Sequence, residues 1–309
     1  MGSLGASGAD PSDLRALTDR LRDADVVHVQ NVMNPDVLAA AVATGKAVVT
    51  VQDHRVFCPG PGRTLPDGSR CATAMSDAVC QTCLPDRTYR TQMLERTAAR
   101  RDAIRGARIV VLSRYMADEL ADAGLPGATV IPPPVRAAPS PAGPGAGFLL
   151  AGRLVHHKGV DWGLVAWRTA DTEHGLSIAG AGAMADSIEG ATMLGWLDRD
   201  ALRAHMAAAR ALLFPSRWQE PFGIAGVEAL AEGTPVVCMD AGGTRDWSDA
   251  GCIVVAPGDV AGMAEALAHL DQAPAAAAAL GRRGWDMVRE RFDPDRVHAA
   301  LRSVYASVA

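Results

Sequence analysis

The sequence predicts an α/β protein with two domains, each built on a doubly wound parallel sheet. The length of 309 residues suits two domains of ordinary size. Short apolar runs alternate with helix-like segments, which is the pattern of parallel strands joined by crossover helices. A segment rich in Pro and Gly divides the chain. We therefore expect a first domain at residues 1–135, a linker at 136–147 and a second domain at 148–309.

In the first domain, short apolar runs indicate strands that alternate with helices. The strands are expected at residues 25–30, 47–51, 108–113 and 128–131, and the helices at 12–23, 35–44, 87–105 and 114–123. Ligands of open α/β sheets bind in the loops beyond the carboxyl ends of the strands. Asn31, Asp53 and His54 occupy such loops, and His28 lies just before one. These four residues are candidate ligand contacts, although a histidine in an apolar strand is more often a core residue.

Residues 57–88 interrupt this alternation with a loop-rich segment that has few large apolar side chains. Its cysteines follow the spacing C-x12-C-x8-C-x2-C. Clustered thiols that include a CxxC pair indicate a tetrahedral zinc site, and bound metal could stabilise a segment that lacks a core. The expected ligands of a structural zinc are Cys58, Cys71, Cys80 and Cys83. Redox-active or disulfide-bonded cysteines, or simple buried thiols, are the alternatives.

The second domain repeats the alternation of strand and helix up to a helical C-terminal region. Its strands are expected at residues 148–151, 176–179, 192–194, 211–214, 235–239 and 252–255. The closing helices are expected at residues 261–270, 275–291 and 294–307. Six strands of this kind predict one parallel sheet covered by helices on both faces.

Composition excludes several classes of protein. The net charge of −5 argues against a nucleic-acid-binding surface, and no apolar run approaches the length of a membrane span. The first residues lack the basic and apolar pattern of a secretion signal. We therefore expect a cytoplasmic protein that has no nucleic-acid partner and no transmembrane segment.

Residues 214–237, with the sequence FPSRWQEPFGIAGVEALAEGTPVV, carry the strongest functional pattern. Pro221 suits the first turn of a helix, and Gly233 suits its end. A helix start with free N–H groups favours anions, and Gly223 allows close approach of a ligand to the backbone. Glu220 and Glu228 would then lie on nearly the same helix face. The pattern suits a nucleotide sugar, and the alternative is an ordinary strand–helix–strand crossover with surface glutamates.

A second pattern follows the first strand of this domain. Arg153 and Lys158 lie in the loop that leads into a helix, where their charges could neutralise a diphosphate leaving group. The chain contains only two lysines, so a lysine at this position is informative. The alternative is a solvated basic loop.

These patterns together resemble one enzyme family. Residues 214–237 resemble the EX7E motif of the retaining glycosyltransferases of family GT4, and the flanks PSRW, EPFG and EALA-G-PVV match as well. AGRLVHHKG at 151–159, IAGAG at 178–182 and GWLD at 195–198 are similar to further elements of the same family. In the first half, DVVHVQN, VTVQDHRVFCP and the spaced cysteines resemble a subgroup of its acceptor-domain sequences.

The resemblance implies a GT-B fold, in which two Rossmann-like domains face a cleft, with a reduced N-terminal domain. It implies transfer of a hexosyl group from a nucleoside diphosphate sugar, with UDP favoured, to a small-molecule, glycan or lipid-linked hydroxyl acceptor with retention of configuration. No cofactor is required for catalysis. The implied catalytic residues are Arg153, Lys158 and Glu220, and the implied donor contacts are Gly152, Arg153, Lys158, Gly195, Trp196, Leu197, Glu220, Phe222, Gly223, Ile224 and Glu228. His28, Asn31, Asp53 and His54 would lie on the acceptor side.

The chain departs from the family pattern in its first domain. The resemblance implies that the first strand–helix units of the acceptor domain are missing or much shortened, and Gln30 and Gln52 stand where family members often have His. An alternative function is therefore a non-catalytic nucleotide-sugar-binding subunit that supports another transferase, and an oligomer or protein partner could complete the reduced domain. A carbohydrate phosphorylase would need a pyridoxal phosphate lysine, and neither lysine has that context. The sequence does not specify the base, the sugar, the acceptor or the oligomeric state.

Overall fold

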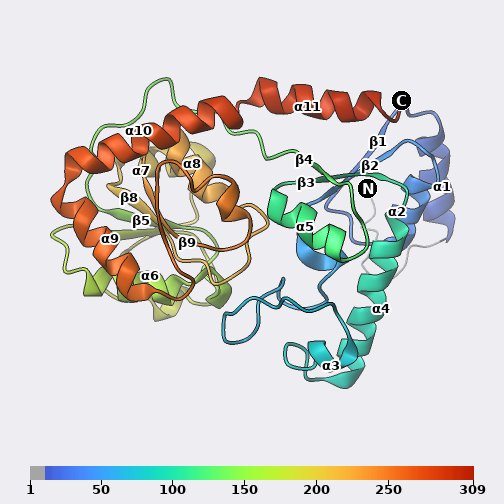
Figure 1. Cartoon of the computed structure of the whole chain (residues 1–309), viewed down its shortest axis with the longest axis horizontal. Helices are drawn as coiled ribbons and strands as arrows, with labels where there is room; N and C mark the ends of the chain where they lie inside the picture. Colours follow the sequence, from blue (N-terminus) through green and yellow to red (C-terminus); the bar gives the residue numbers. More distant parts are fainter. Residues whose placement is uncertain (1–10) are drawn as a thin grey trace. The chain divides into compact units, whose positions relative to one another are not determined.

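The computed structural model describes residues 11–309. The chain divides into two compact units, of which the second is Pro133–Arg296. The first unit contains the residues up to Pro132 together with Val297–Ala309. Each unit is built on one parallel sheet (Figure 1). The last residues, Val297–Ala309, thus group with the first unit and not with the second.

The first unit holds a four-stranded sheet in the order β1-β2-β3-β4. Its strands are β1 (Val27–Gln30), β2 (Ala47–Val51), β3 (Arg108–Val111) and β4 (Thr129–Val130). Its helices are α1 (Pro11–Arg22), α2 (Pro35–Val42), α3 (Asp77–Cys80), α4 (Arg87–Ala103) and α5 (Arg114–Asp122), with a short 3-10 helix η1 (His54–Val56). The strands and the longer helices confirm the expected positions to within a few residues.

Alternating strand residues place apolar side chains on both faces of this first sheet. Val29, Val49 and Val111 face a core that also contains Leu38 of α2 and Met116 of α5. The structure thus explains the continuous apolar runs of β2 and β3, since both of their faces are buried.

The C-terminal helix α11 (Pro294–Ala306) covers the other face of the first sheet. Val297 and Val304 of α11 pack against Val48 and Val110 in one cluster of buried residues. This packing is the reason why the end of the chain belongs to the first unit, although the expectation placed it in the second domain.

The second unit holds a six-stranded parallel sheet in the order β10-β9-β8-β5-β6-β7. Its strands are β5 (Phe148–Ala151), β6 (Leu176–Ala179), β7 (Thr192–Gly195), β8 (Ala211–Phe214), β9 (Val236–Met239) and β10 (Cys252–Val255). The chain moves outward from β5 through β6 to β7 and then returns to β8 on the other side of β5. The strand order therefore reverses between β5 and β8, and ligands of such sheets bind beyond the carboxyl ends of the strands at this point.

Helices cover both faces of the second sheet (Figure 1). They are α6 (Val160–Thr169), α7 (Arg199–Ala208), α8 (Ile224–Glu232), α9 (Val260–Gln272) and α10 (Pro274–Arg291), with the 3-10 helices η2 (His156–Lys158), η3 (Ala185–Ser187) and η4 (Gly243–Asp246). Helix α6 packs against α9, whereas α8 packs against α7 and α10. The sheet is therefore held between two helical layers, as the alternation of elements predicts.

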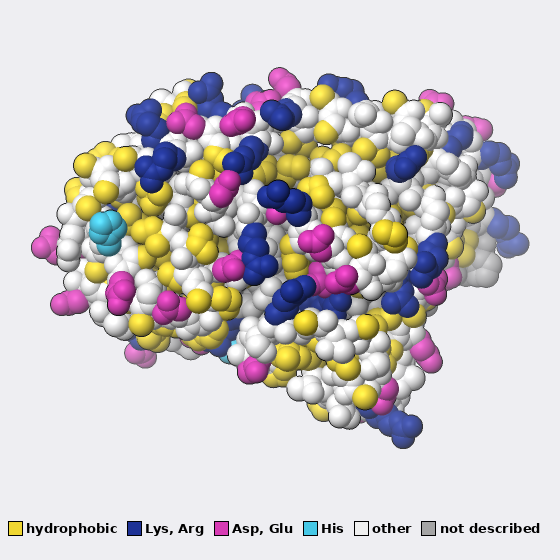
Figure 2. Space-filling view, in the orientation of Figure 1, with side chains coloured by type: hydrophobic (Ala, Val, Ile, Leu, Met, Phe, Trp, Pro, Cys, Tyr) yellow, Lys and Arg dark blue, Asp and Glu magenta, His cyan; other side chains and the backbone are white. Residues whose placement is uncertain are grey.

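Charged side chains of both signs are mixed at the surface. Figure 2 shows Lys and Arg interspersed with Asp and Glu on the face in view, in keeping with totals of 30 basic and 35 acidic residues. Among residues 11–309, no helix combines the length and the apolar character needed to cross a membrane.

Candidate donor site

The loop after β5 and the loop after β8 meet at the point where the strand order reverses. Gly159 ends η2 with a φ of 68° and begins α6. A Cβ at this position would lie 1.8 Å from the backbone oxygen of Pro215, so only glycine allows the two loops to approach this closely. The approach brings Lys158, the last residue of η2, against the loop that carries Glu220.

Lys158 and Glu220 form a largely buried ion pair. The Nζ of Lys158 lies 2.7 Å from Oε1 of Glu220, whose side chain is 4% exposed. Ser216 donates a hydrogen bond of 2.7 Å to the same oxygen. Lys158 also lies over the ring of Trp218, 5.0 Å from its centroid. The carboxylate of Glu220 is therefore held in one orientation by two donors on a single oxygen.

Glu220 does not belong to α8, which corrects the expected geometry of the motif. The helix begins at Ile224, and Glu220 instead forms an isolated parallel bridge with Gly242. Its backbone oxygen accepts a hydrogen bond of 2.7 Å from the N–H of Gly243. Because this extended pairing precedes the helix, Pro221 lies outside the first turn, and Glu220 and Glu228 do not share a helix face.

The N-terminus of α8 offers backbone N–H groups with no side-chain cap. Gly223 is the N-cap residue, has a φ of 85° and provides no capping side chain. A Cβ on Gly223 would lie 3.1 Å from the Phe214 ring and 3.2 Å from the Trp247 ring. The indole N–H of Trp247 donates to the backbone oxygen of Phe222 at 2.6 Å, which fixes the entry to the helix. This helix start suits an anionic group, as the sequence predicts.

Glu228 lies one turn further along α8, in a small cavity of about 90 Å³. Arg199 and Arg203 of α7 and Arg136 of the linker also line this cavity, together with Ile224. Burial raises the pKa of Glu228, while Arg199 and Arg203 act in the opposite direction. Lys158 and Glu220 do not line this cavity, so of the four predicted charged groups the structure pairs only these two directly among the described residues.

Gly195, Trp196 and Leu197, which are expected to contact the donor, precede α7, whose first residue lines the Glu228 cavity. Trp196 is 76% exposed, and Gly195 has a φ of 67°. Asp198 caps α7 by accepting a hydrogen bond of 2.8 Å from the N–H of Ala201. Arg199, the next residue, lines the Glu228 cavity. An exposed indole on a fixed turn suits stacking on an aromatic base.

Arg153 is exposed, and its Nη2 lies 3.4 Å from Nε2 of His157. Burial lowers the pKa of His157, and the nearby charges of Lys158 and Arg153 lower it further. Both predicted cations thus act on one histidine. Gly152 is exposed at the start of the same loop.

Sequence reasoning gave no role to three residues that organise this site. Ser216 orients Glu220, Trp218 lies beneath Lys158, and Arg217 forms an ion pair with Asp161 of α6. All three belong to the PSRW segment, so the motif itself was the signal that could have identified them.

The acceptor-side histidines are held inside the first unit. His54 is 2% exposed, and its Nε2 lies 3.0 Å from the hydroxyl of Tyr115. His28 lies 2.7 Å from the hydroxyl of Thr50 and 2.6 Å from that of Tyr305 in α11. These contacts favour structural roles for both histidines, and their contact with an acceptor stays a prediction. Asn31 and Asp53 both contact Arg55.

The predicted zinc ligands are free thiols that lie in one region. Burial raises the pKa of Cys83, and the neighbouring thiols Cys58, Cys71 and Cys80 raise it further. Within the described residues, however, no group of three or more His, Cys, Asp or Glu side chains is arranged to hold a metal ion. This arrangement gives no support for a preformed zinc site, and the structural zinc stays a prediction. Elemental analysis of protein purified under reducing conditions would test for the metal.

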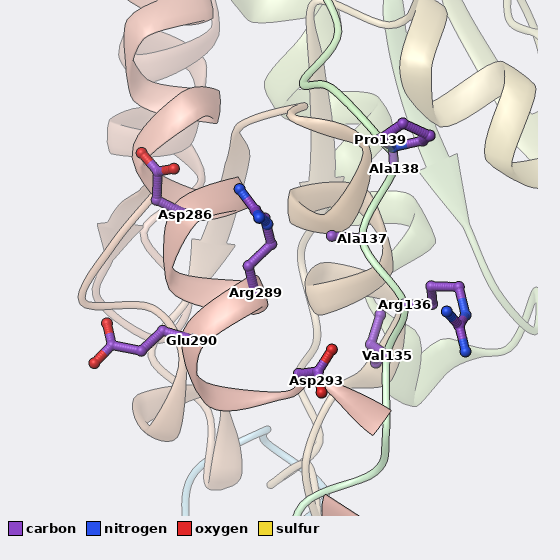
Figure 3. A pocket seen from close by; sticks show the side chains of 9 residues that line it. All are labelled: Val135, Arg136, Ala137, Ala138, Pro139, Asp286, Arg289, Glu290 and Asp293. Carbon is purple, nitrogen blue, oxygen red and sulfur yellow. The ribbon is translucent and has the colours of Figure 1, made fainter. Parts of the chain in front are cut away.

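A larger hollow of about 520 Å³ lies elsewhere in the second unit, between the linker and α10. Figure 3 shows it lined by Asp286, Arg289 and Glu290 of α10, while Arg136 points to the other side of the linker. Its lining mixes charges of both signs and contains no residue of the motifs. We therefore do not place the donor here.

Part of this chain is similar to known glycosyltransferases. Residues 145–272 match the family model described as Glycosyl transferases group 1. The glycogen synthase of Mycobacterium tuberculosis is 34% identical over 222 residues, which are 64% of this chain and 53% of that protein. This chain therefore spans about half the length of that curated relative.

Among solved structures, HepE of Anabaena in complex with UDP has a TM-score of 0.70 and 16% identity over 95% of this chain and 82% of that one. TarM of S. aureus, in complex with Fondaparinux, alpha-GlcNAc-glycerol and UDP, has a TM-score of 0.70 and 13% identity over 95% of this chain and 59% of that one. At these identities the likeness shows the fold. Residues 145–272 are thus similar to group 1 glycosyltransferases, and the two parallel sheets, like those of the solved structures, make a GT-B-like fold.

Proposed function

We propose that this protein transfers a hexosyl group from a nucleoside diphosphate sugar, with UDP as the nucleotide, to a hydroxyl acceptor with retention of configuration. The observation that carries the proposal is the buried contact of Lys158 and Ser216 with Glu220, on the loop that leads into the uncapped start of α8. HepE has been solved with UDP-glucose, which supports a donor of this class.

In the proposed site, the diphosphate binds to the first amides of α8 and to the charges of Lys158 and Arg153. Negative charge grows on the leaving diphosphate as the glycosidic bond breaks, so these cations stabilise the transition state more than the bound donor. Oε1 of Glu220 is engaged by Lys158 and Ser216, so its other oxygen would accept a hydrogen bond from a sugar hydroxyl. Glu228 would accept hydrogen bonds from the ribose, and Trp196 would stack on the base.

Retention follows in this proposal from attack on the face that the leaving group vacates. Glu220 acts as a positioning group, and the acceptor hydroxyl gives its proton to the departing diphosphate. The acceptor would be a small molecule, a glycan or a lipid-linked sugar. No cofactor takes part in these steps.

The test combines nucleotide binding with turnover. Calorimetry with UDP, GDP and ADP should show tightest binding of UDP, and the anomeric configuration of the product should match that of the donor sugar. Lys158→Ala should lower turnover more than it lowers UDP affinity, because the leaving-group charge is largest in the transition state. Lys46→Ala, at the other lysine, is the control and should change neither. Equal turnover of Lys158→Ala and the unchanged protein would contradict the proposal.

A non-catalytic role remains the second candidate, because the first sheet has four strands against six in the second. A binding subunit would bind UDP with the same dependence on Glu228 but would neither transfer nor hydrolyse the sugar. Turnover by the purified chain with a panel of UDP-sugars and acceptors separates the two candidates.

A further inference from the structure

One face of α4 carries buried polar atoms without a partner. Among the described residues, the unpartnered atoms include Oγ1 of Thr97, Nη1 of Arg100 and Nε of Arg101. Positions 97, 100 and 101 are spaced so that they lie on the same side of a helix. Arg100 is 3% exposed, and Thr97 is fully buried. Buried polar groups of native proteins nearly always bond to protein, water or an ion, so three orphaned atoms in one turn require an explanation.

This part of α4 is packed against the segments that follow β1 and β2. Helix α4 contacts both α2 and η1. The Nε of Arg100 donates a hydrogen bond of 2.7 Å to the backbone oxygen of Met33, in the loop after β1. The guanidinium of Arg100 is thereby held near the carboxyl ends of the strands of the first sheet, where open α/β sheets bind ligands.

A second arginine approaches the same place from η1. The Nη2 of Arg55 donates to Oδ1 of Asn31 at 3.0 Å, and its Nε donates to Asp53 at 2.8 Å. Asn31 has a φ of 52°, a left-handed conformation that Asn adopts more easily than most residues. The side chain of Arg55 is 47% exposed, so this arginine is open to solvent whereas Arg100 is covered.

The charges around Arg100 are mostly positive. Burial lowers the pKa of Arg100, and the nearby charges of Arg55 and Arg96 lower it further. Asp53 acts in the opposite direction, but it is already paired with Arg55. Within residues 11–309, no carboxylate forms an ion pair with Arg100, so this buried guanidinium keeps an unpartnered N–H group for an anion.

We propose that Arg55 and Arg100 bind an anionic group, a phosphate or a carboxylate, carried by the sugar acceptor. That the anion belongs to a sugar acceptor rests on the proposed function. That an anion binds here rests only on the arginine cluster of Arg55, Arg96 and Arg100. The planar guanidinium group presents paired N–H donors that match both anions. Arg55 would contact the anion at the solvent side and Arg100 from beneath, while Arg96 adds positive charge. Asn31 and Asp53 hold Arg55 in place.

Anion binding can be tested on the full chain without knowledge of the acceptor. Thermal unfolding is followed against rising inorganic phosphate or acetate, with chloride at matched ionic strength as reference. We expect saturable stabilisation by at least one of the two anions, and the anion that saturates at the lower concentration identifies the source as phosphate or carboxylate. If neither phosphate nor acetate stabilises the protein more than chloride does, the proposal is overturned.

Arg55→Gln should weaken anion binding at least tenfold, since the exposed Arg55 forms the entrance to the site. Arg22→Gln is the matched control, because Arg22 lies in the same unit, is 72% exposed and, among the described residues, pairs with Asp19 of its own helix. Arg55→Lys keeps the charge but loses the paired donors, and it should give an intermediate affinity. Equal weakening in Arg55→Gln and Arg22→Gln would show a non-specific charge effect and would overturn the proposal.

Transfer assays connect the anion to the acceptor. With donor at saturation, Arg55→Gln should raise KM at least tenfold for an anionic acceptor and leave UDP affinity unchanged. If transfer proceeds and Arg55→Gln leaves KM unchanged for anionic and neutral acceptors alike, this inference fails while the proposed function stands. If UDP does not bind but anion binding still depends on Arg55, the proposed function fails while the anion site stands.

Discussion

Ser216 and Lys158 both donate hydrogen bonds to Oε1 of Glu220. In the proposed site, however, Ser216 would touch no substrate atom. It therefore acts as a positioning residue. A hydrogen bond to a charged group contributes about 1.5–3 kcal/mol, so Ser216→Ala should reduce kcat by roughly tenfold or more. KM for the donor should change little, because the phosphate contacts remain. Ser216→Thr keeps a hydroxyl and should restore most of the rate.

Steady-state kinetics check this prediction, with Ser187→Ala as the control. Ser187 is exposed, and its hydroxyl donates to the backbone oxygen of Met184. A loss of kcat in Ser216→Ala that Ser216→Thr does not recover, or that comes with an equal rise in KM, would argue against a positioning role.

Protonation of Glu228 should make UDP binding depend on pH. Burial raises its pKa, so it takes up a proton at a higher pH than an ordinary glutamate. UDP affinity should therefore fall as the pH is lowered towards the range in which Glu228 protonates. Glu228→Ala should weaken UDP about tenfold or more at neutral pH, from the loss of about 1.5–3 kcal/mol.

Calorimetry from pH 7.5 downward tests the Glu228 prediction, and Glu228→Gln should flatten the pH profile. Glu265→Ala, at an exposed position of α9, is the control and should preserve both affinity and profile. Unchanged affinity in Glu228→Ala would remove Glu228 from the nucleotide site.

At the scale of elements, α8 shows what local sequence can and cannot predict. Its span of Ile224–Glu232 and its end at Gly233 follow from the Ala-rich apolar pattern and a C-terminal glycine. The extended conformation of Glu220 depends on pairing with Gly242, a residue distant in sequence. Pro221 is compatible with a first helical turn and with an extended segment, so the local pattern could not decide between them.

Helix α11 gives the prediction for this scale. Val304 is buried against the face of the first sheet that contains Val48 and Val110. Val304→Ala should lower the free energy of unfolding by about 2 kcal/mol, because two methyl groups leave a packed cluster. Urea denaturation measures this loss, and Arg302→Ala, at an exposed position of α11, should shift the free energy by less than about 0.5 kcal/mol. Equal stability of both variants would contradict the packing role of α11.

At the scale of the whole molecule, the sequence predicts both parallel sheets, because each strand is a short apolar run bounded by turn residues. It also predicts the motif loops that meet at β5 and β8. It misplaces α11, since an amphipathic helix does not encode which sheet it will cover. The arginine cluster of the first unit was not predicted either, because Arg55 and Arg100 belong to different elements and meet only in the folded chain.

Acid sensitivity of the folded chain is the prediction that concerns the molecule as a whole. Burial lowers the pKa of His54 from 6.5 to about 3, and burial also lowers the pKa of His28. The unfolded chain therefore binds more protons than the folded chain below pH 6.5. The stabilising contribution of neutral His54 is full above pH 6.5 and is lost progressively as the pH falls towards about 3.

The resulting slope is about 1.4 kcal/mol per pH unit for each such histidine within its window. Urea midpoints measured from pH 7 to pH 4 should therefore fall more steeply for the unchanged protein than for His54→Gln, which keeps an amide donor for Tyr115 but does not titrate. The carboxylates titrate in both proteins, so the difference between the two curves isolates His54. Parallel curves would mean that His54 is protonated as easily in the folded chain as in the unfolded one, which would contradict its burial beside Tyr115.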